Sequence, residues 1–214
     1  LLNTNAFVIL SNGIDLQDNS GTKIGTITSP YKFFHEWKRI DEDTEGVVSL
    51  DTTIRGTCSK DKLIDLFENF LLFDDSGGDV SKIIAKNHQY IGVNKALAKM
   101  SNVDSLDELK NKLGVFWHTQ GSGKSYSMVF LSQKIHRKFS GSFTILVVVD
   151  RSELETQIYD TFTAVGAVTE ENLIAKSRED LRNLLLENHR YIFTIIHKFS
   201  FDPNIETEYP LLSK

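Results

Sequence analysis

The sequence predicts an α/β protein, with a mixed sheet in its first third and a parallel sheet in the remainder. Three observations lead to this prediction. Short β-type runs separated by turn residues open the chain, buried β-type runs alternate with helical patterns after residue 80, and a glycine-rich loop stands between a β-type run and a helical one. Alternating strands and helices are typical of a parallel sheet covered by helices.

The first 73 residues contain three strand patterns, at 6–11, 14–17 and 23–28, separated by turn residues. These patterns predict an antiparallel meander. Apolar residues at helical spacing then predict a helix over 61–73. The acidic, glycine-containing run at 74–79 is the expected linker to the rest of the chain.

The second region alternates between helix and strand. Strand patterns lie at 114–117, 143–149 and 191–196, and the run at 143–149 is apolar enough for a strand buried on both faces. This order predicts a doubly wound parallel sheet. Helical patterns cover 80–100, 124–138 and 152–162, and capping boxes are expected at 105–108, 152–155 and 177–180.

The composition is that of a globular chain. The 214 residues are 40% hydrophobic and 25% charged, which excludes collagen, coiled coils and wholesale disorder. No apolar run approaches the about 20 residues of a membrane span, and the single cysteine, Cys58, cannot form an internal disulfide. We therefore expect no membrane partner and a reducing compartment, the cytoplasm. The chain begins with Leu rather than Met, so we expect a piece of a longer protein.

The net charge changes sign along the chain. Residues 1–79 carry −7, residues 80–139 carry +7, and residues 140–214 carry −5. A local positive field attracts a polyanion even when the whole chain is acidic. A lysine-rich helical face in solvent gives the same charges, so both interpretations stay open.

The strongest chemical signal is the run V-F-W-H-T-Q-G-S-G-K-S over residues 115–125. Its end, Gly123, Lys124 and Ser125, fits the phosphate-loop pattern G-x-x-x-x-G-K-[ST], although His118 replaces the first glycine. Glycines let backbone N–H groups turn toward phosphate oxygens, and the next helix points its positive end at the same anion. Lys124 would neutralise the phosphates and the Ser125 hydroxyl would bind Mg²⁺. The run therefore predicts a nucleotide site.

Two further residues have more than one interpretation. Asp150 ends an apolar run, as a Walker B aspartate that holds Mg²⁺ does, but a strand end that contacts a nucleic-acid backbone and an ordinary helix start fit equally well. The Gln89 amide can both donate and accept, as reading adenine requires, although a glutamine alone is more often a surface residue. The histidines lack the spacing of a metal site.

The run W-H-T-Q-G-S-G-K-S over 117–125 resembles motif I of the restriction (R) subunit of type I restriction-modification enzymes, in which the His-Thr-Gln start is usual. The segment 87–96 is similar to the family's sequence just before this motif, 148–157 resembles motif Ia, and 194–199 resembles motif Ib. Residues 7–13 and 24–27 are similar to the last strands of the family's nuclease domain. The resemblance covers nearly the whole chain.

The resemblance implies a division of the chain. Residues 1–73 would be the C-terminal part of an endonuclease-like domain with a mixed sheet, residues 74–79 a linker, and residues 80–214 the first part of a superfamily 2 helicase-like ATPase domain of the RecA-like parallel α/β type. The family's nuclease residues and DEAH box have no match in this chain. We therefore expect an internal fragment that is inactive by itself.

The resemblance also implies roles for single residues. Lys124 would be catalytic, Gln89 would read adenine, and Ser125 would hold Mg²⁺. The Walker B acid would then not be Asp150. ATP would be bound by Gln89, Thr119, Gln120, Gly121, Ser122, Gly123, Lys124 and Ser125. DNA would be contacted by Asp150, Arg151, Ser152, Thr194 and Lys198.

The implied parent protein is an ATP-dependent type I site-specific deoxyribonuclease. It would couple ATP hydrolysis to translocation along double-stranded DNA and to cleavage, together with methylation (M) and specificity (S) subunits. Two alternatives stay open: a superfamily 2 DNA-dependent ATPase without a nuclease, and a small P-loop kinase or nucleotide-binding module with Asp150 as its Walker B residue.

Overall fold

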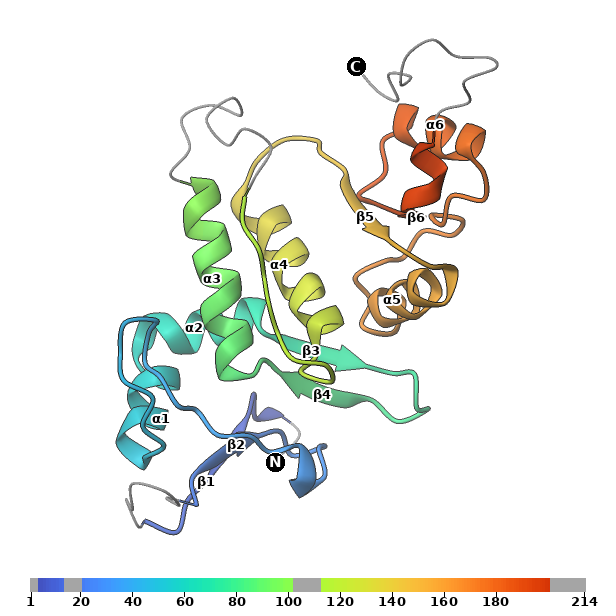
Figure 1. The fold of residues 1–214 in the computed structure, drawn as a ribbon. Coiled ribbons are helices and arrows are strands. Elements are labelled where there is room, and N and C mark those ends of the chain that lie inside the picture. Colours follow the sequence, from blue (N-terminus) through green and yellow to red (C-terminus); the bar gives the residue numbers. More distant parts are fainter. Residues whose placement is uncertain (1–3, 14–20, 102–112, 201–214) are drawn as a thin grey trace. The chain divides into compact units, whose positions relative to one another are not determined.

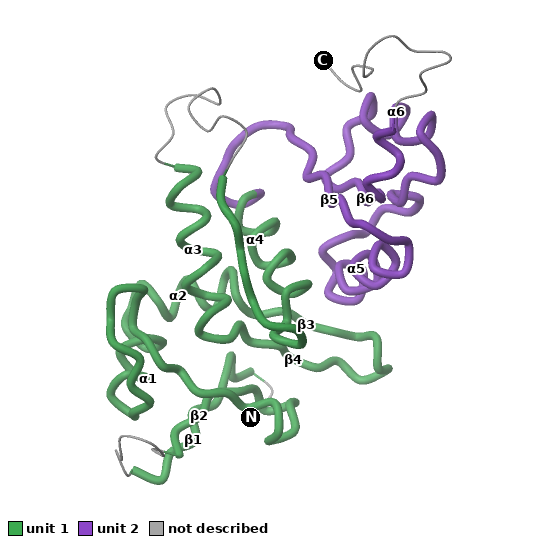
Figure 2. The backbone as a smooth tube through the Cα atoms, in the orientation of Figure 1, with its two compact units in different colours: residues 1–135 green, residues 136–214 purple. Residues whose placement is uncertain are grey.

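The computed structural model describes residues 4–13, 21–101 and 113–200. The chain divides into two compact units, residues 1–135 and 136–214 (Figure 2). Both units mix helices with small sheets, as the predicted α/β class requires. The strand predicted at 14–17 and the capping box at 105–108 lie outside the described residues.

The first unit contains two antiparallel strand pairs and a group of helices (Figure 1). Strands are present within the predicted runs 6–11 and 23–28, and both are shorter than expected. They pair directly and antiparallel, with Ile9 opposite Ile24, so the predicted meander, in which the run 14–17 would lie between them, is wrong. In chain order the elements are β1 (Val8–Leu10), β2 (Lys23–Gly25), the 3-10 turn η2 (Tyr31–Phe33), α1 (Leu50–Thr57), α2 (Lys60–Asn69), β3 (Leu71–Asp74), β4 (Ser81–Ile84), α3 (Asn87–Ser101) and α4 (Lys124–Lys138).

Residues 74–79 are the turn of a hairpin rather than a free linker. β3 pairs antiparallel with β4, so the helix predicted over 61–73 ends at Asn69 and the helix predicted over 80–100 begins only at Asn87. The turn is stabilised because the N–H and Oγ of Ser76 both donate to Asp74 Oδ1, at 3.0 and 2.6 Å. Turn chemistry of this kind serves a hairpin as well as a linker. The assignment of the flanking residues to two domains stays a prediction.

Aromatic rings form the core of the first unit. Ring centroids lie 5.5 Å apart for Trp37 and Tyr90, 4.7 Å for Phe70 and Tyr90, and 5.5 Å for Phe70 and Phe130. Trp37, Phe70 and Phe130 have no exposed surface. Such pairs add to the stabilisation that burial gives. The cluster therefore joins the segment before the hairpin turn to α3 and α4 beyond it.

A buried ion pair lies beside this aromatic cluster. Lys134 Nζ on α4 donates to Asp65 Oδ1 on α2 and to Asn94 Oδ1 on α3, each at 2.5 Å, and sits 4.8 Å from the Phe70 ring centroid. Burial raises the pKa of Asp65, but hydrogen bonds from Lys134, the Lys134 charge and hydrogen bonds from Asn69 and Asn94 bring it below its usual value. Three helices thus meet at one ammonium group.

We expect Lys134→Met to lower the free energy of unfolding by about 3 kcal/mol, because it leaves the Asp65 carboxylate half-buried without its cation. The methionine keeps most of the apolar stem, so the loss reports the charge. Urea denaturation measures the effect. Lys138→Met, at an exposed position of the same helix, is the control and should change stability by no more than about 0.5 kcal/mol. Equal effects of the two substitutions would contradict the importance of the buried pair.

The second unit is built on a parallel strand pair, as predicted. Ile145 pairs with Tyr191 and Val149 with Ile195, and Ile174 adds a parallel bridge to Phe193. The predicted cap at Ser177 is confirmed, since its side chain accepts the N–H of Asp180 at 3.1 Å. The elements are β5 (Ile145–Val149), α5 (Ser152–Ala164), α6 (Arg178–Leu186), β6 (Tyr191–Ile195) and the 3-10 turn η3 (Ile196–Phe199).

Three expectations for the region after residue 113 are wrong. Residues 114–117 form no strand, and Val115 and Trp117 are 94% and 84% exposed, because their backbone has no neighbouring strand to pair with in the described part of the chain. β5 is not buried on both faces, since the described sheet of this unit has two strands and Val148 is exposed. Ser152 is the first helical residue of α5 and not its cap, which is Arg151.

His189 should make the second unit's stability depend on pH. Hydrogen bonds to Glu170 (Nδ1, 2.7 Å) and Glu187 (Nε2, 2.8 Å) raise the pKa of His189 above its ordinary value. A raised folded-state pKa stabilises the fold at pH values below the unfolded value of about 6.5, and this contribution disappears as the pH rises through the folded pKa. We expect His189→Gln to lower the melting temperature more at about pH 6 than at about pH 8.5. A difference independent of pH would contradict the assignment.

Candidate nucleotide site

The phosphate-loop sequence leads directly into α4, whose bounds, Lys124–Lys138, match the predicted helix. Gly121 (φ +75°) and Gly123 (φ +92°) both adopt the left-handed backbone region that favours glycine. The first N–H groups of a helix have no acceptor inside it, so the start of α4 presents donors next to the loop. The glycine conformations and the helix start are thus compatible with the predicted phosphate site, which stays a prediction.

The loop folds back on its own lysine. Lys124 Nζ donates to the carbonyl oxygens of His118 and Thr119, at 3.0 and 3.3 Å. Ser122 closes the same turn, because its N–H and its Oγ donate to Thr119 O at 3.3 and 2.7 Å. Lys124 is exposed. An anion at this ammonium group could therefore replace the two carbonyl oxygens as hydrogen-bond acceptors, and no buried contact would have to break.

Gln89 ties α3 to the loop. Its side chain is buried; Oε1 accepts the N–H of Lys86 at 2.8 Å, and Nε2 donates to Gly123 O at 2.8 Å. A Cβ on Gly123 would lie 2.9 Å from Nε2, so glycine is also needed there for this close approach. Both ends of the amide are engaged with the backbone. In this arrangement Gln89 anchors the loop. One N–H of Nε2 and one lone pair of Oε1 have no part in these two bonds, so the adenine contact predicted for Gln89 stays a prediction.

Two histidines hold the entrance of the loop. The rings of His88 on α3 and His118 meet edge to face at 4.5 Å, and His88 Nε2 lies 3.3 Å from Ser122 O. Burial lowers the pKa of both rings. The nearby His118 lowers the pKa of His88 further, and the charge of Lys124 lowers the pKa of His118 further. Phe116 packs against His118 at 4.4 Å. The sequence predicts no role for these histidines, because they are far apart in the chain and nothing in the sequence indicates that their rings touch.

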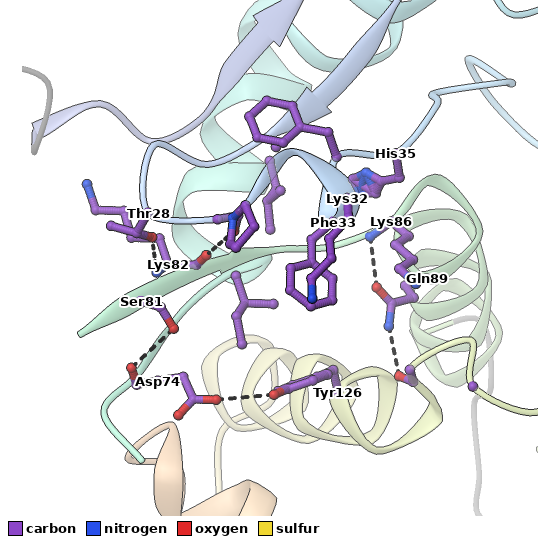
Figure 3. Close-up of a pocket in the computed structure, with 18 residues that line it drawn as sticks. Thr28, Lys32, Phe33, His35, Asp74, Ser81, Lys82, Lys86, Gln89 and Tyr126 are labelled. Carbon is purple, nitrogen blue, oxygen red and sulfur yellow. Dashed lines mark hydrogen bonds between the residues drawn. The ribbon is translucent and has the colours of Figure 1, made fainter. Parts of the chain in front are cut away.

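A cavity of about 510 Å³ adjoins the loop within the first unit (Figure 3). Gly121, Gly123 and Gln89 line one side of it. Residues 28–30 and 32–35 line the other side, and Tyr126 Oη donates to Asp74 Oδ2 at 3.2 Å along its border. The aromatic residues at 31–37 carry no functional signal in the sequence, because only the folded chain brings this segment beside α4.

The residues predicted to contact DNA fall into two groups, both in the second unit. Asp150, Arg151 and Ser152 are exposed where β5 ends and α5 begins. Arg151 pairs with Asp150 at 3.1 Å, and its hydrogen bond lowers the pKa of the Asp150 carboxyl.

The other two, Thr194 and Lys198, are less accessible than the first group, and their predicted contact with DNA stays a prediction. Thr194 on β6 has no exposed surface. Lys198 Nζ donates to Glu155 Oε1 at 3.3 Å and to the carbonyl oxygen of Ala175, so it stabilises the packing of η3. The Thr194 side chain therefore lies in the interior of the unit, whereas 14% of the Lys198 side chain is exposed.

A comparison of the sequence with protein families identifies the family to which the chain belongs. The model of the SWI2/SNF2 ATPase family matches residues 88–214, which is more than half of the chain and includes Gln89 and the phosphate loop. The chain belongs to the SWI2/SNF2 ATPase family. Membership in this family supports ATP use by the site that Lys124 and the loop glycines form.

Several relatives of this SWI2/SNF2 ATPase chain are endonuclease subunits of type I restriction enzymes by name. The HindI endonuclease subunit of Haemophilus influenzae is 32% identical over 96% of the chain and 20% of its own length. A candidate MjaIXP endonuclease subunit of Methanocaldococcus jannaschii is 29% identical over 92% of the chain and 20% of its own length. A candidate MjaVIIP subunit of the same organism is 41% identical over 40% of the chain and 8% of its own length. The chain thus spans about a fifth of the first two relatives.

No helix between residues 4 and 200, the gaps at 14–20 and 102–112 aside, combines the length and apolar character needed to cross a bilayer. In the same ranges no three histidine, cysteine, aspartate or glutamate side chains gather as a metal site would require.

We expect Gln89→Ala to loosen the connection between α3 and the loop. The Lys86 N–H loses its acceptor, and one hydrogen bond is worth about 1 kcal/mol, so the exchange of this amide with solvent should become about fivefold faster. Hydrogen–deuterium exchange measures the rate. Lys99→Ala, at an exposed position of the same helix, should leave the Lys86 amide unchanged. Unaltered exchange in Gln89→Ala would refute the anchoring role.

Proposed function

We propose that this chain is the ATP-binding segment of a type I restriction endonuclease subunit, which couples ATP hydrolysis to translocation along double-stranded DNA and to cleavage. The observation that carries the proposal is the phosphate loop with Lys124 at the start of α4, in a chain that is similar to such subunits over 96% of its length. The nuclease activity belongs to the parent protein, and the chain alone is proposed to lack it.

The residues present fit MgATP. Lys124, held only by carbonyl oxygens at an exposed position, would transfer its hydrogen bonds to the phosphates. The loop from Thr119 to Gly123 would enclose them, and the Ser125 hydroxyl would bind Mg²⁺. Bound Mg²⁺ neutralises the phosphate charge that develops during phosphoryl transfer. Lys124 would act in that step as a fixed positive charge, which makes it the catalytic residue of this segment.

The remaining assignments follow the same proposal. Residues 1–73 would end an endonuclease-like domain, and residues 80–214 would begin the ATPase domain. Among the predicted DNA contacts, the exposed group at 150–152 would lie on the DNA track, where Arg151 would exchange Asp150 for a phosphate of the DNA backbone. Methylation and specificity subunits are the proposed partners, and the cytoplasm is the proposed location.

A nuclease-free ATPase of the same family shares every feature of the phosphate loop. The restriction subunit is favoured over it because the similarity to such subunits includes residues before the ATPase match at 88–214. The kinase alternative requires Asp150 to hold Mg²⁺, but this carboxylate is exposed and paired with Arg151. A Walker B role for Asp150 is therefore not proposed.

We expect Lys124→Ala to reduce ATP-driven translocation by the full-length protein by at least about a hundredfold, because phosphoryl transfer depends on the charge that it removes. Triplex displacement on linear DNA measures translocation, and circular dichroism should show an unchanged fold since the side chain is exposed. Lys99→Ala, also exposed, controls for the loss of one positive charge and should translocate normally. Normal translocation by Lys124→Ala would refute the proposed function.

A further inference from the structure

We propose that Phe33 provides the stacking surface for the purine base of the nucleotide, so that the base is held by the N-terminal segment and not only by the ATPase segment. This inference rests on the proposed function, because it concerns the same nucleotide. It adds residues 30–35, which neither the phosphate-loop pattern nor the family match at 88–214 includes.

The cavity beside the phosphate loop has the size and the walls that such a base requires. Its volume of about 510 Å³ lies within the range of small-molecule sites, about 300–1,000 Å³. Gly121 and Gly123 line it on the loop side, and Pro30 and Phe33 line it on the other. A nucleotide whose phosphates lie in the loop therefore has a neighbouring cavity for its base.

Phe33 is available for stacking. The residue is 62% exposed although it lines the cavity. The ammonium group of Lys32 lies over the ring, 5.0 Å from its centroid, and both side chains are exposed, so a ligand can displace it. Figure 3 shows the Phe33 and Lys32 side chains reaching from η2 toward α4. Tyr31, on the same turn, instead stacks on Phe34 with centroids 5.8 Å apart and is not among the residues that line the cavity. Adjacent aromatic residues of one turn thus differ in their access to the site.

The segment that carries Phe33 is held in place before any ligand binds. His35 and Ile24 exchange backbone hydrogen bonds at 2.8 and 2.9 Å, which fixes the end of η2 on β2. Thr28 Oγ1 accepts the N–H of Lys82 on β4 at 2.7 Å, and Thr26 Oγ1 donates to Lys82 O at 2.7 Å. A preorganised wall reduces the entropy lost on binding.

The charges and hydrogen-bonding groups of the cavity also favour a nucleotide whose base stacks on an aromatic ring. Lys32, Lys82 and Lys86 line the cavity together with a single carboxylate, Asp74, so the cavity favours an anionic ligand. The Gln89 amide already has a backbone partner at each end, so these two bonds leave one N–H and one oxygen lone pair for a base. Stacking on an aromatic ring needs no such partner, because every base has a π-face.

The test compares MgATP with inorganic tripolyphosphate, which has the phosphates but no base, in calorimetric titrations of the full-length protein. Phe33→Ala should weaken MgATP binding about fivefold to a hundredfold, which is the range for loss of one base–aromatic stack. Binding of tripolyphosphate should change less than about twofold. Phe33→Leu, which keeps the apolar volume without a π-face, should resemble Phe33→Ala, and Phe33→Trp should restore binding.

Tyr31→Ala is the matched control, since this ring is equally exposed (60%) on the same turn but does not line the cavity. It should bind MgATP as the wild type does. If Phe33→Ala also binds MgATP like the wild type while Lys124→Ala loses it, the stacking role of Phe33 is wrong and the proposed function stands. If the wild type binds neither MgATP nor tripolyphosphate, or Lys124→Ala binds both normally, the proposed function itself fails.

Discussion

The salt bridge between Lys134 and Asp65 is the constraint on which the first unit depends. One buried ammonium joins α2, α3 and α4 while it lies over the Phe70 ring. Because the phosphate loop is the start of α4, ten residues before Lys134, this contact also fixes the loop relative to α2. A buried pair of this kind adds little to stability when intact but costs a lot when broken, so it favours one packing of the three helices over others. Rigid placement of the loop helix is what allows residues distant in sequence to line one site.

The loop itself is arranged around groups that exchange partners. Lys124 is hydrogen-bonded to carbonyl oxygens of its own loop, while Gln89 holds the following turn through Gly123 O. The first contact is exposed and the second is buried. Under the proposed function, a nucleotide would replace the exposed partners of the lysine and leave the glutamine anchor in place. This division between a fixed support and an exchangeable charge is how preorganised anion sites limit the cost of binding.

Sequence patterns predicted correctly the features that depend on contacts between residues close together in the chain. The bounds of α4, the cap at Ser177 and the glycines of the loop depend on neighbours within a few residues, and all three were predicted. The run at 114–117 has the composition of a buried strand yet is exposed, because a strand needs a partner that composition does not specify. The sequence predicts a linker at 74–79 for a similar reason. The pairing of β3 with β4 depends on both strands together, and neither strand's sequence specifies it.

The sequence by itself determined the α/β class, the parallel pairing in the second unit and the chemical identity of the phosphate loop, because periodicity and the glycine–lysine pattern are local properties. Only the tertiary structure decided which polar side chains are accessible. It buried Thr194, paired Lys198 with Glu155, engaged both ends of the Gln89 amide, and brought Phe33 to the cavity beside Gly121. Burial and hydrogen-bond partners depend on residues distant along the chain, and packing selects those partners only when the chain folds.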